Sequence, residues 1–114
     1  MPKDIQTLCD VGSGAGLPGI PLAIVRPDLQ ITLIEPSRKR CAFLRHITRR
    51  LTLKNVNLAE STAESANLDQ FDLAVTRATF TIEDLLKKTK HLLKPGGWLL
   101  LSKGPKYKDE LVSL

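Results

Sequence analysis

The chain has 114 residues, enough for one domain with a single hydrophobic core, and its 42% hydrophobic content argues against intrinsic disorder. The formal net charge of +5 favours a polyanionic partner, and two cysteines 32 positions apart fit neither a secreted disulfide framework nor a metal site. No run of 18 apolar residues and no signal-peptide pattern occurs, so we expect a soluble, cytoplasmic domain outside the membrane.

The predicted elements alternate between strands and helices along the chain. Apolar runs predict strands at residues 5–11, 31–35, 56–59, 71–76 and 98–102. Helical patterns and stop signals predict helices at residues 17–25, 38–53, 61–67 and 82–93, with Ser37 as the cap of the second. The Lys-Pro-Gly-Gly run at 94–97 predicts a turn into the last strand. Five strands joined by four crossovers indicate a single α/β domain with a doubly wound, mostly parallel sheet.

A glycine-rich turn follows the first predicted strand, at its carboxyl end, which is where ligands bind in such folds. Residues 14–19, GAGLPG, fit the G-x-G-x-x-G pattern of dinucleotide sites, but the Asp10 carboxylate would face a pyrophosphate there. Residues 10–16, DVGSGAG, fit the acid-x-G-x-G-x-G pattern of S-adenosylmethionine sites, whose ligand is cationic and lacks phosphate. The sequence therefore favours S-adenosylmethionine, with a helix cap as the alternative role for Asp10. The cofactor-binding candidates of this turn are Asp10, Gly12, Ser13, Gly14 and Gly16.

Glu35 ends the second predicted strand, 21 positions after Gly14. An acid at this point accepts hydrogen bonds from ribose hydroxyls. The same role would serve NAD, so Glu35 indicates nucleoside binding without choosing the cofactor. A solvated acid that pairs with Arg38 is the alternative interpretation.

The run from Asp10 to Leu22, DVGSGAGLPGIPL, resembles the glycine loop of the bacterial small-subunit ribosomal RNA guanine-N7 methyltransferases, also called the glucose-inhibited division protein B family. Its LPGIPL part is more specific than the glycines. Further similarities are Lys39-Arg40, Phe43-Leu44, Thr76-Arg77-Ala78 and Lys103-Gly104. Pro36 and Thr76 stand where the family usually has Ser, and neither difference removes a charged group.

This resemblance implies a Rossmann-like class I methyltransferase that uses S-adenosylmethionine to form 7-methylguanosine in small-subunit ribosomal RNA. It assigns Gly12 and Leu17 to the methionine and sulfonium region. It assigns Ala63 and Glu64 to the adenine, and Arg77 to the mouth of the cofactor site. A structural ion pair with an acid such as Asp72 is the alternative role for Arg77.

The chain is shorter than the family pattern. Family members carry helices before the first strand and a strand pair after the fifth, and we expect both to be absent here. The strand at 98–101 would then form an uncovered sheet edge that invites self-association. A truncated cofactor-binding module without activity, or a methyltransferase for another substrate, therefore stays open as an alternative.

The implied chemistry needs little from side chains. Guanine N7 has a lone pair and no proton, so no general base is required and the rate must come from in-line placement. His46 and His91 are interpreted as surface residues because neither has partners at metal-ligand spacing. Cys9 and Cys41 are interpreted as packing residues, with a cytosine-methylating nucleophile as the remote alternative.

The second predicted helix is strongly basic, with seven Lys and Arg residues and no acid between residues 36 and 59. At 100° per residue, Arg38, Arg45 and Arg49 share one face of this helix. Two interpretations stay open, a solvated outer face and a strip that contacts RNA phosphates. Lys103, after the last predicted strand, is a further candidate for RNA contact.

Overall fold

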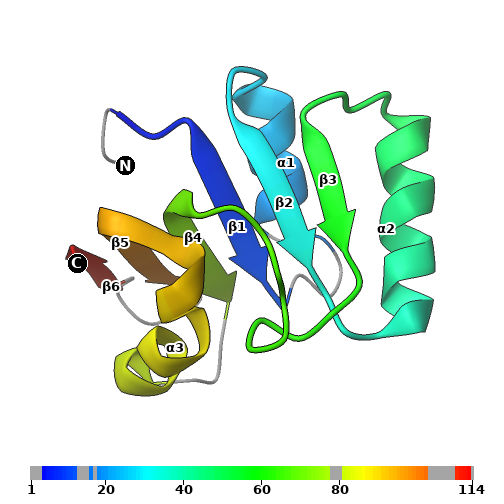
Figure 1. Ribbon diagram of the computed structural model, residues 1–114. Helices are drawn as coiled ribbons and strands as arrows, with labels where there is room; N and C mark the ends of the chain where they lie inside the picture. The colour runs from blue at the N-terminus through cyan, green and yellow to red at the C-terminus, as the bar shows by residue number, and fades with distance from the viewer. Residues whose placement is uncertain (1–3, 13–15, 17, 78–80, 103–109, 114) are drawn as a thin grey trace.

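The computed structural model describes residues 4–12, 16, 18–77, 81–102 and 110–113 of the chain (Figure 1). The strands are β1 (Thr7–Val11), β2 (Gln30–Ile34), β3 (Val56–Ala59), β4 (Phe71–Arg77), β5 (Leu93–Ser102) and β6 (Glu110–Ser113). The helices are α1 (Gly19–Val25), α2 (Arg38–Arg50), α3 (Ile82–Thr89) and the short 3-10 helix η1 (Lys90–Leu92). No helix among the described residues is long and apolar enough to cross a bilayer.

The strands form one sheet in the order β3-β2-β1-β4-β5-β6. All neighbouring pairs are parallel except β5 and β6, which are antiparallel. Strand order reverses between β1 and β4, because the chain moves outward to β2 and β3 and then returns to the other side of β1. The prediction of a doubly wound, mostly parallel sheet is confirmed.

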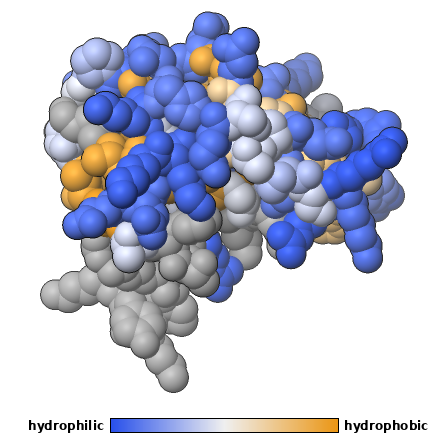
Figure 2. Space-filling view, turned by 60° about the horizontal axis from the view of Figure 1, so that its bottom comes forward, coloured by the Kyte–Doolittle hydropathy of each residue, from blue (hydrophilic) through white to orange (hydrophobic). Residues whose placement is uncertain are grey.

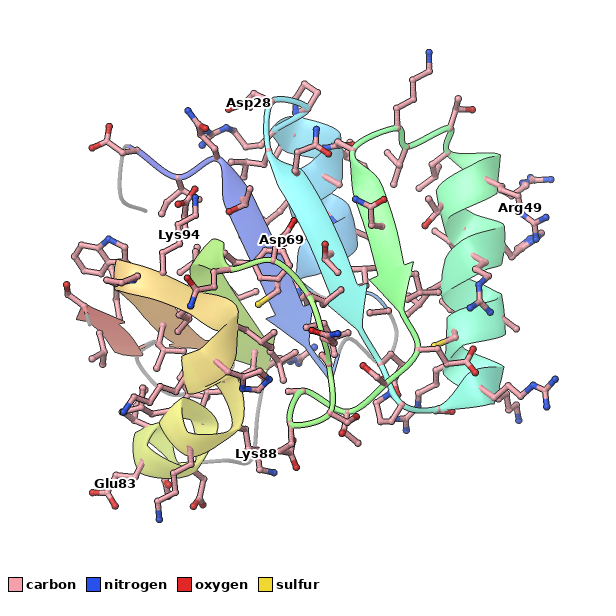
Figure 3. The ribbon with its side chains drawn as sticks, viewed as in Figure 1. Asp28, Arg49, Asp69, Glu83, Lys88 and Lys94 are labelled. Atoms are coloured by element: carbon pink, nitrogen blue, oxygen red, sulfur yellow. The ribbon has the colours of Figure 1, made fainter. Side chains whose placement is uncertain are left out.

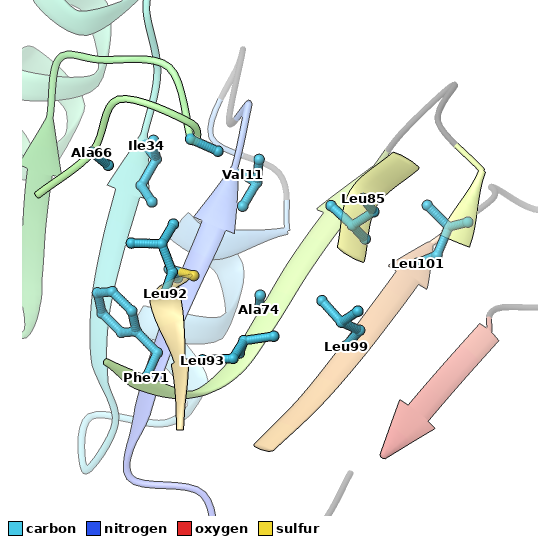
Figure 4. Packing of buried hydrophobic residues seen from close by; sticks show 12 residues of the cluster. Val11, Ile34, Ala66, Phe71, Ala74, Leu85, Leu92, Leu93, Leu99 and Leu101 are labelled. Atoms are coloured by element: carbon cyan, nitrogen blue, oxygen red, sulfur yellow. The ribbon is translucent and has the colours of Figure 1, made fainter. Parts of the chain in front are cut away.

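Apolar side chains from alternate strand positions build a core on each face of the sheet. On one face, Leu8 and Leu33 pack with Ile20 of α1 and Leu44 of α2. On the other face, a second cluster packs under α3 and η1, and Figure 4 shows Leu85 of α3 above Ala74 and Leu99 of the strands beneath it. Burial on both faces explains why the strands are apolar almost throughout.

The number of strands and the uncovered edge were predicted wrongly. A sixth strand, β6, follows the fifth and pairs with it from Trp98 opposite Ser113 to Leu101 opposite Glu110. Strand β5 is therefore an inner strand of the sheet, and the expected cause of self-association is not present. The predicted turn at 94–97 lies inside β5 as an irregularity, since Phe71 pairs with Leu93 and Leu73 with Trp98.

The helix predicted at residues 61–67 is also wrong. This segment forms turns and bends, and the Thr62 hydroxyl accepts a hydrogen bond of 3.2 Å from the Ser65 N–H. Such local hydrogen bonds from Ser and Thr compete with helix formation. The helix predicted at residues 82–93 is shorter in the structure, where α3 ends at Thr89 and η1 follows it.

The basic helix begins as predicted and ends early. The Ser37 hydroxyl accepts a hydrogen bond of 3.3 Å from the Arg40 N–H, which confirms it as the cap of α2. The helix stops at Arg50 instead of residue 53, and Thr52 then adopts a φ of 52°. This left-handed conformation turns the chain out of the helix toward β3.

At the opposite end of the sheet from the predicted site, Asp72 joins the start of β4 to its neighbours (Figure 3 labels its partner Lys94). One carboxylate oxygen accepts hydrogen bonds from the N–H groups of Gln6 (2.9 Å) and Thr7 (3.0 Å), and the other from the Lys94 ammonium (2.9 Å). Partial burial opposes ionisation, but these hydrogen bonds and the Lys94 charge outweigh it and lower the pKa of Asp72 to about 2.

Asp72 should therefore make stability depend on pH in the acid range. Because its folded pKa lies below its unfolded value, the contribution is present above about pH 4 and is lost as pH falls toward 2. We expect Asp72→Asn to lower the free energy of unfolding by about 2 kcal/mol at pH 7 and by little at pH 2, measured by urea unfolding. The exposed Asp69 supplies the control Asp69→Asn, and equal pH dependence of the two variants would contradict this role.

Candidate functional site

The carboxyl ends of β1, β2 and β4 meet where strand order reverses, and the predicted ligand residues follow them. The chain after β1 leads into α1 on one face of the sheet, whereas the segment after β3 and α3 cover the other face (Figure 1). In open α/β sheets, this divergence leaves a crevice at the strand ends. Figure 2 shows the molecule with this edge turned forward, and its described surface is largely hydrophilic.

Asp10 ties the end of β1 to the start of α1. Its side chain is fully buried, and Oδ2 accepts a hydrogen bond of 2.9 Å from the N–H of Gly19, the first residue of α1. Asp10 therefore makes the hydrogen bond of a helix cap, which is the alternative role that the sequence indicated for it. A carboxylate at a helix N-terminus is also favoured by the helix dipole.

Gly19 is a residue that the sequence prediction did not include in the site. A Cβ at this position would lie 2.5 Å from Leu33 Cδ2 and 2.8 Å from Asp10 Oδ2. Only glycine therefore allows α1 to approach the sheet closely enough for the hydrogen bond to Asp10. The third glycine of G-x-G-x-x-G has this packing role in nucleotide-binding folds, so the signal was present in the sequence.

Gly12 and Gly16 have backbone conformations that other residues rarely adopt, with φ of 70° and 91°. The Gly12 N–H donates a hydrogen bond of 2.8 Å to the Ile34 carbonyl, which holds the turn against the end of β2. A Cβ at Gly12 would meet no atom of the described part of the chain within 4 Å, whereas one at Gly16 would lie 2.6 Å from Ile20 Cγ1. The described residues therefore leave the space beside Gly12 open, and Gly16 serves the packing of α1.

Glu35 follows β2 directly and is only 2% exposed. Its Oε2 accepts a hydrogen bond of 2.7 Å from the Ser37 N–H, and its carbonyl accepts one of 3.1 Å from the Cys41 thiol. The contact with Ser37 holds the carboxylate at the start of α2, and the contact with Cys41 holds the backbone. The alternative interpretation of Glu35 as a solvated acid is wrong.

The adenine candidates lie on the segment that crosses the sheet between β3 and β4. Ala63 is buried in the same apolar cluster as Val11 and Ile34, which lie at the ends of β1 and β2. Ala66 belongs to this cluster too, and Figure 4 shows it beside Ile34. Glu64 is exposed. Small side chains thus cover the carboxyl ends of the first two strands.

Arg77 ends β4, next to β1 in the sheet, and its side chain is exposed. The residue before it, Thr76, is buried and donates a hydrogen bond of 2.8 Å from its hydroxyl to the Val11 carbonyl. The proposed partner Asp72 lies at the other end of the same strand and pairs with Lys94. The alternative of a structural Arg77–Asp72 ion pair is therefore wrong.

The structure thus brings together Asp10, Gly12, Gly16, Glu35 and Ala63 around the ends of β1 and β2, with Arg77 at the end of β4 beside them. The candidates Ser13, Gly14, Leu17 and Lys103 lie outside the described residues. Arg38, Arg45 and Arg49 are all exposed on α2.

Both cysteines are buried. Burial, reinforced by the neighbouring Asp10 charge, raises the pKa of the Cys9 thiol far above its ordinary value. Burial and the nearby carboxylates of Glu60 and Glu35 also raise the pKa of Cys41, although the positive charge of Arg45 opposes them. A nucleophilic cysteine must form the thiolate, so these environments support the packing role predicted for both residues.

The chain is similar to known proteins in both sequence and fold. The family model for rRNA small subunit methyltransferase G (GidB) matches residues 1–114. Curated relatives of that name include one from Xanthomonas campestris pv. campestris strain B100, 44% identical over 109 residues, covering 95% of this chain and 51% of the relative. Another, from Helicobacter pylori strain ATCC 700392 / 26695, is 42% identical over 110 residues, covering 96% of this chain and 62% of the relative. The chain thus spans about half the length of most of the curated relatives it matches.

Solved structures of other methyltransferases share the fold at lower sequence identity. A SAM-dependent methyltransferase from Aquifex aeolicus has a TM-score of 0.72 at 24% identity, covering 88% of this chain and 61% of that one. The precorrin-6y C5,15-methyltransferase from Geobacter metallireducens GS-15 also has a TM-score of 0.72, at 21% identity, covering 88% of this chain and 54% of that one. The expected Rossmann-like class I methyltransferase fold is confirmed.

Proposed function

The chain belongs to the rRNA small subunit methyltransferase G family, and from this premise we propose that it binds S-adenosylmethionine and methylates a guanine at N7 in small-subunit ribosomal RNA. Its partner is then ribosomal RNA or the small ribosomal subunit, and its compartment the cytoplasm. Because the chain spans about half the length of these relatives, binding of the cofactor and catalysis are separate parts of the proposal.

Two neighbouring strand ends support the proposal, one with exposed backbone and the other with a carboxylate that is held in place. Gly12 follows β1 in a left-handed conformation, with space that the described residues leave open where a side chain would be, and Glu35 follows β2 as a buried acid. A nucleoside needs both features, since its body must approach the backbone and its ribose hydroxyls need an acceptor. The buried carboxylate of Asp10 at the end of β1 disfavours a pyrophosphate there and tolerates a cationic ligand.

The proposed roles follow from these positions. Gly12 and Leu17 contact the methionine and sulfonium region, together with the neighbouring Ser13, Gly14 and Gly16 of the turn. Asp10 acts indirectly, because it holds the start of α1 against the end of β1. Glu35 accepts hydrogen bonds from the ribose. Ala63 and Glu64 border the adenine from the segment after β3.

S-adenosylmethionine supplies an electrophilic methyl group on a sulfonium. Guanine N7 carries a lone pair and no proton, so the chain needs no residue that removes a proton. Its task is to hold the base and the cofactor in line and to exclude water, and such placement can account for a large share of a rate enhancement. A base must leave its stack to reach the cofactor at these strand ends, which favours a single-stranded or flipped guanine.

Calorimetric titration tests the cofactor proposal directly. We expect S-adenosylmethionine or its demethylated product to bind and NAD to bind far more weakly, because the carboxylate of Asp10 at the end of β1 would repel a pyrophosphate at that strand end. Equal affinity for NAD would contradict the proposal. Methyl transfer to 30S particles or naked ribosomal RNA, assayed with labelled S-adenosylmethionine, then separates an active enzyme from a cofactor-binding module.

Arg77 gives a mutational test of the same site. A guanidinium can hold the methionine carboxylate bidentately, and losing a hydrogen bond to a charged group costs about 1.5–3 kcal/mol. We therefore expect Arg77→Ala to weaken S-adenosylmethionine binding about 10- to 150-fold in calorimetric titration. Arg77→Lys should recover only part of the loss. Normal affinity in an Ala variant that melts far lower without ligand would mean that Arg77 is structural.

A further inference from the structure

We propose that a groove between α2 and β3 binds the phosphate backbone of the RNA that the chain methylates, an inference that rests on the proposed function. The groove has a volume of about 330 Å³. It is lined by Arg45, Thr48, Arg49, Val56, Asn57 and Leu58. We call it the α2–β3 groove.

Two cationic side chains border this groove from the helix. Arg45 and Arg49 lie one turn apart, and residues three or four apart share a face of a helix. Both are exposed, and Figure 3 shows Arg49 pointing outward from α2. No acid occurs between residues 36 and 59, so neither the helix nor the adjoining strand offsets their charge. A polyanion is the ligand that this charge distribution favours.

The strand side of the groove offers backbone hydrogen-bond donors. β3 lies at one end of the described sheet, and the carbonyls of Asn55 and Ala59 accept hydrogen bonds from Ile31 and Glu35 on the β2 side. Backbone groups alternate in direction along a strand, so those of Val56 and Leu58 face away from β2. An added peptide strand would use both the N–H and the C=O groups of this edge. The flanking guanidinium groups favour a phosphate chain instead.

One of these two cations already forms an ion pair within the chain. Arg45 Nη2 lies 3.2 Å from Glu60 Oε1, and the two side chains are 49% and 36% exposed. A pair so open to water is weak, so a phosphate can replace the carboxylate at small cost. Glu60 directly follows β3, as Glu35 follows β2. This end of the groove therefore lies at the carboxyl ends of the strands, where the cofactor candidates are. RNA held in the groove would therefore lead toward the site.

The test is the salt dependence of binding to a single-stranded RNA oligonucleotide, measured by fluorescence anisotropy between 50 and 200 mM salt. Each phosphate of a single strand that the protein neutralises adds about 0.7 to the log–log slope. We expect the double variant Arg45→Gln/Arg49→Gln to reduce the slope by about 1.4. The control Lys87→Gln/Lys90→Gln removes the same charge from exposed positions on α3 and η1, which cover the other face of the sheet, and should leave the slope unchanged. Equal slopes in the two double variants would overturn the proposal.

Glu60→Gln tests the competition in the opposite direction. Freeing Arg45 should strengthen RNA binding by up to about fivefold, and the gain should vanish when Arg45 is also replaced by Gln. Unchanged or weaker binding would overturn the proposal, as would equally effective competition by a poly-glutamate peptide. S-adenosylmethionine affinity should stay the same in all these variants. If the unmodified chain fails to bind S-adenosylmethionine, the proposed function fails, and the RNA slopes still decide whether the groove binds phosphate.

Discussion

Glu35→Ala is expected to weaken S-adenosylmethionine binding by about 10²- to 10⁴-fold. In the proposed complex the carboxylate accepts hydrogen bonds from both ribose hydroxyls, and each bond to a charged group contributes about 1.5–3 kcal/mol. The unliganded chain already holds this carboxylate in place through the Ser37 N–H at 2.7 Å. Little ordering is therefore left to oppose binding, which is why we expect one of the largest losses of affinity at this position. Calorimetric titration measures it.

The same substitution has a structural effect that must be measured separately. Ser37 caps α2, and without Glu35 its N–H loses an acceptor, at a cost of about 1–3 kcal/mol in the free energy of unfolding. The variant Glu35→Gln keeps a carbonyl oxygen for Ser37 while it removes the charge. We expect it to melt near the temperature of the unmodified chain and to bind S-adenosylmethionine at least 10-fold more weakly. If Glu35→Ala lowers only the melting temperature, Glu35 serves α2 and not the ligand.

The strand ends of the site could be predicted because local signals decide them. Asp10 and Glu35 each follow an apolar run, and the helix cap Ser37 marks where α2 begins. Glycines after a buried strand likewise mark a turn that needs unusual backbone conformations, as the φ of 70° at Gly12 confirms. The order of strands is a different matter, because the chain returns from β3 past β2 to place β4 on the other side of β1.

Contacts between distant parts of the chain could not be predicted in this way. The approach of Gly19 to Asp10 depends on how α1 packs on the sheet, so the prediction left Gly19 out although the third glycine of G-x-G-x-x-G can have this role. Strand β6 has four residues, and it is stabilised by pairing with β5 rather than by its own sequence. At Ala63 and Ala66, burial against the sheet outweighs helix propensity, so the segment crosses as turns. The ion pair of Arg45 with Glu60 joins a helix to a strand end and has no local signal.

Two glycines far apart in the fold offer a matched test of close approach by the cofactor. Gly12 and Gly96 have similar backbone conformations, with φ of 70° and 78°, and a Cβ at either would meet no atom of the described residues within 4 Å. Gly12 lies at the predicted site, whereas Gly96 lies in the irregular part of β5 at the other end of the sheet. Valine at either position should therefore cost a similar amount of stability, about 1–3 kcal/mol from backbone strain.

Only Gly12→Val should affect the ligand. The added carbons would enter the space that we assign to S-adenosylmethionine, and overpacking costs about 1–3 kcal/mol. We expect Gly12→Val to weaken S-adenosylmethionine binding about 5- to 150-fold, and Gly96→Val to leave it within a factor of about two. Titration below both melting temperatures compares the folded forms. Because backbone strain is shared by the two variants, a difference in affinity can come only from what lies beside Gly12. If both variants bind normally, the cofactor does not approach the turn after β1, and the proposed site is wrong.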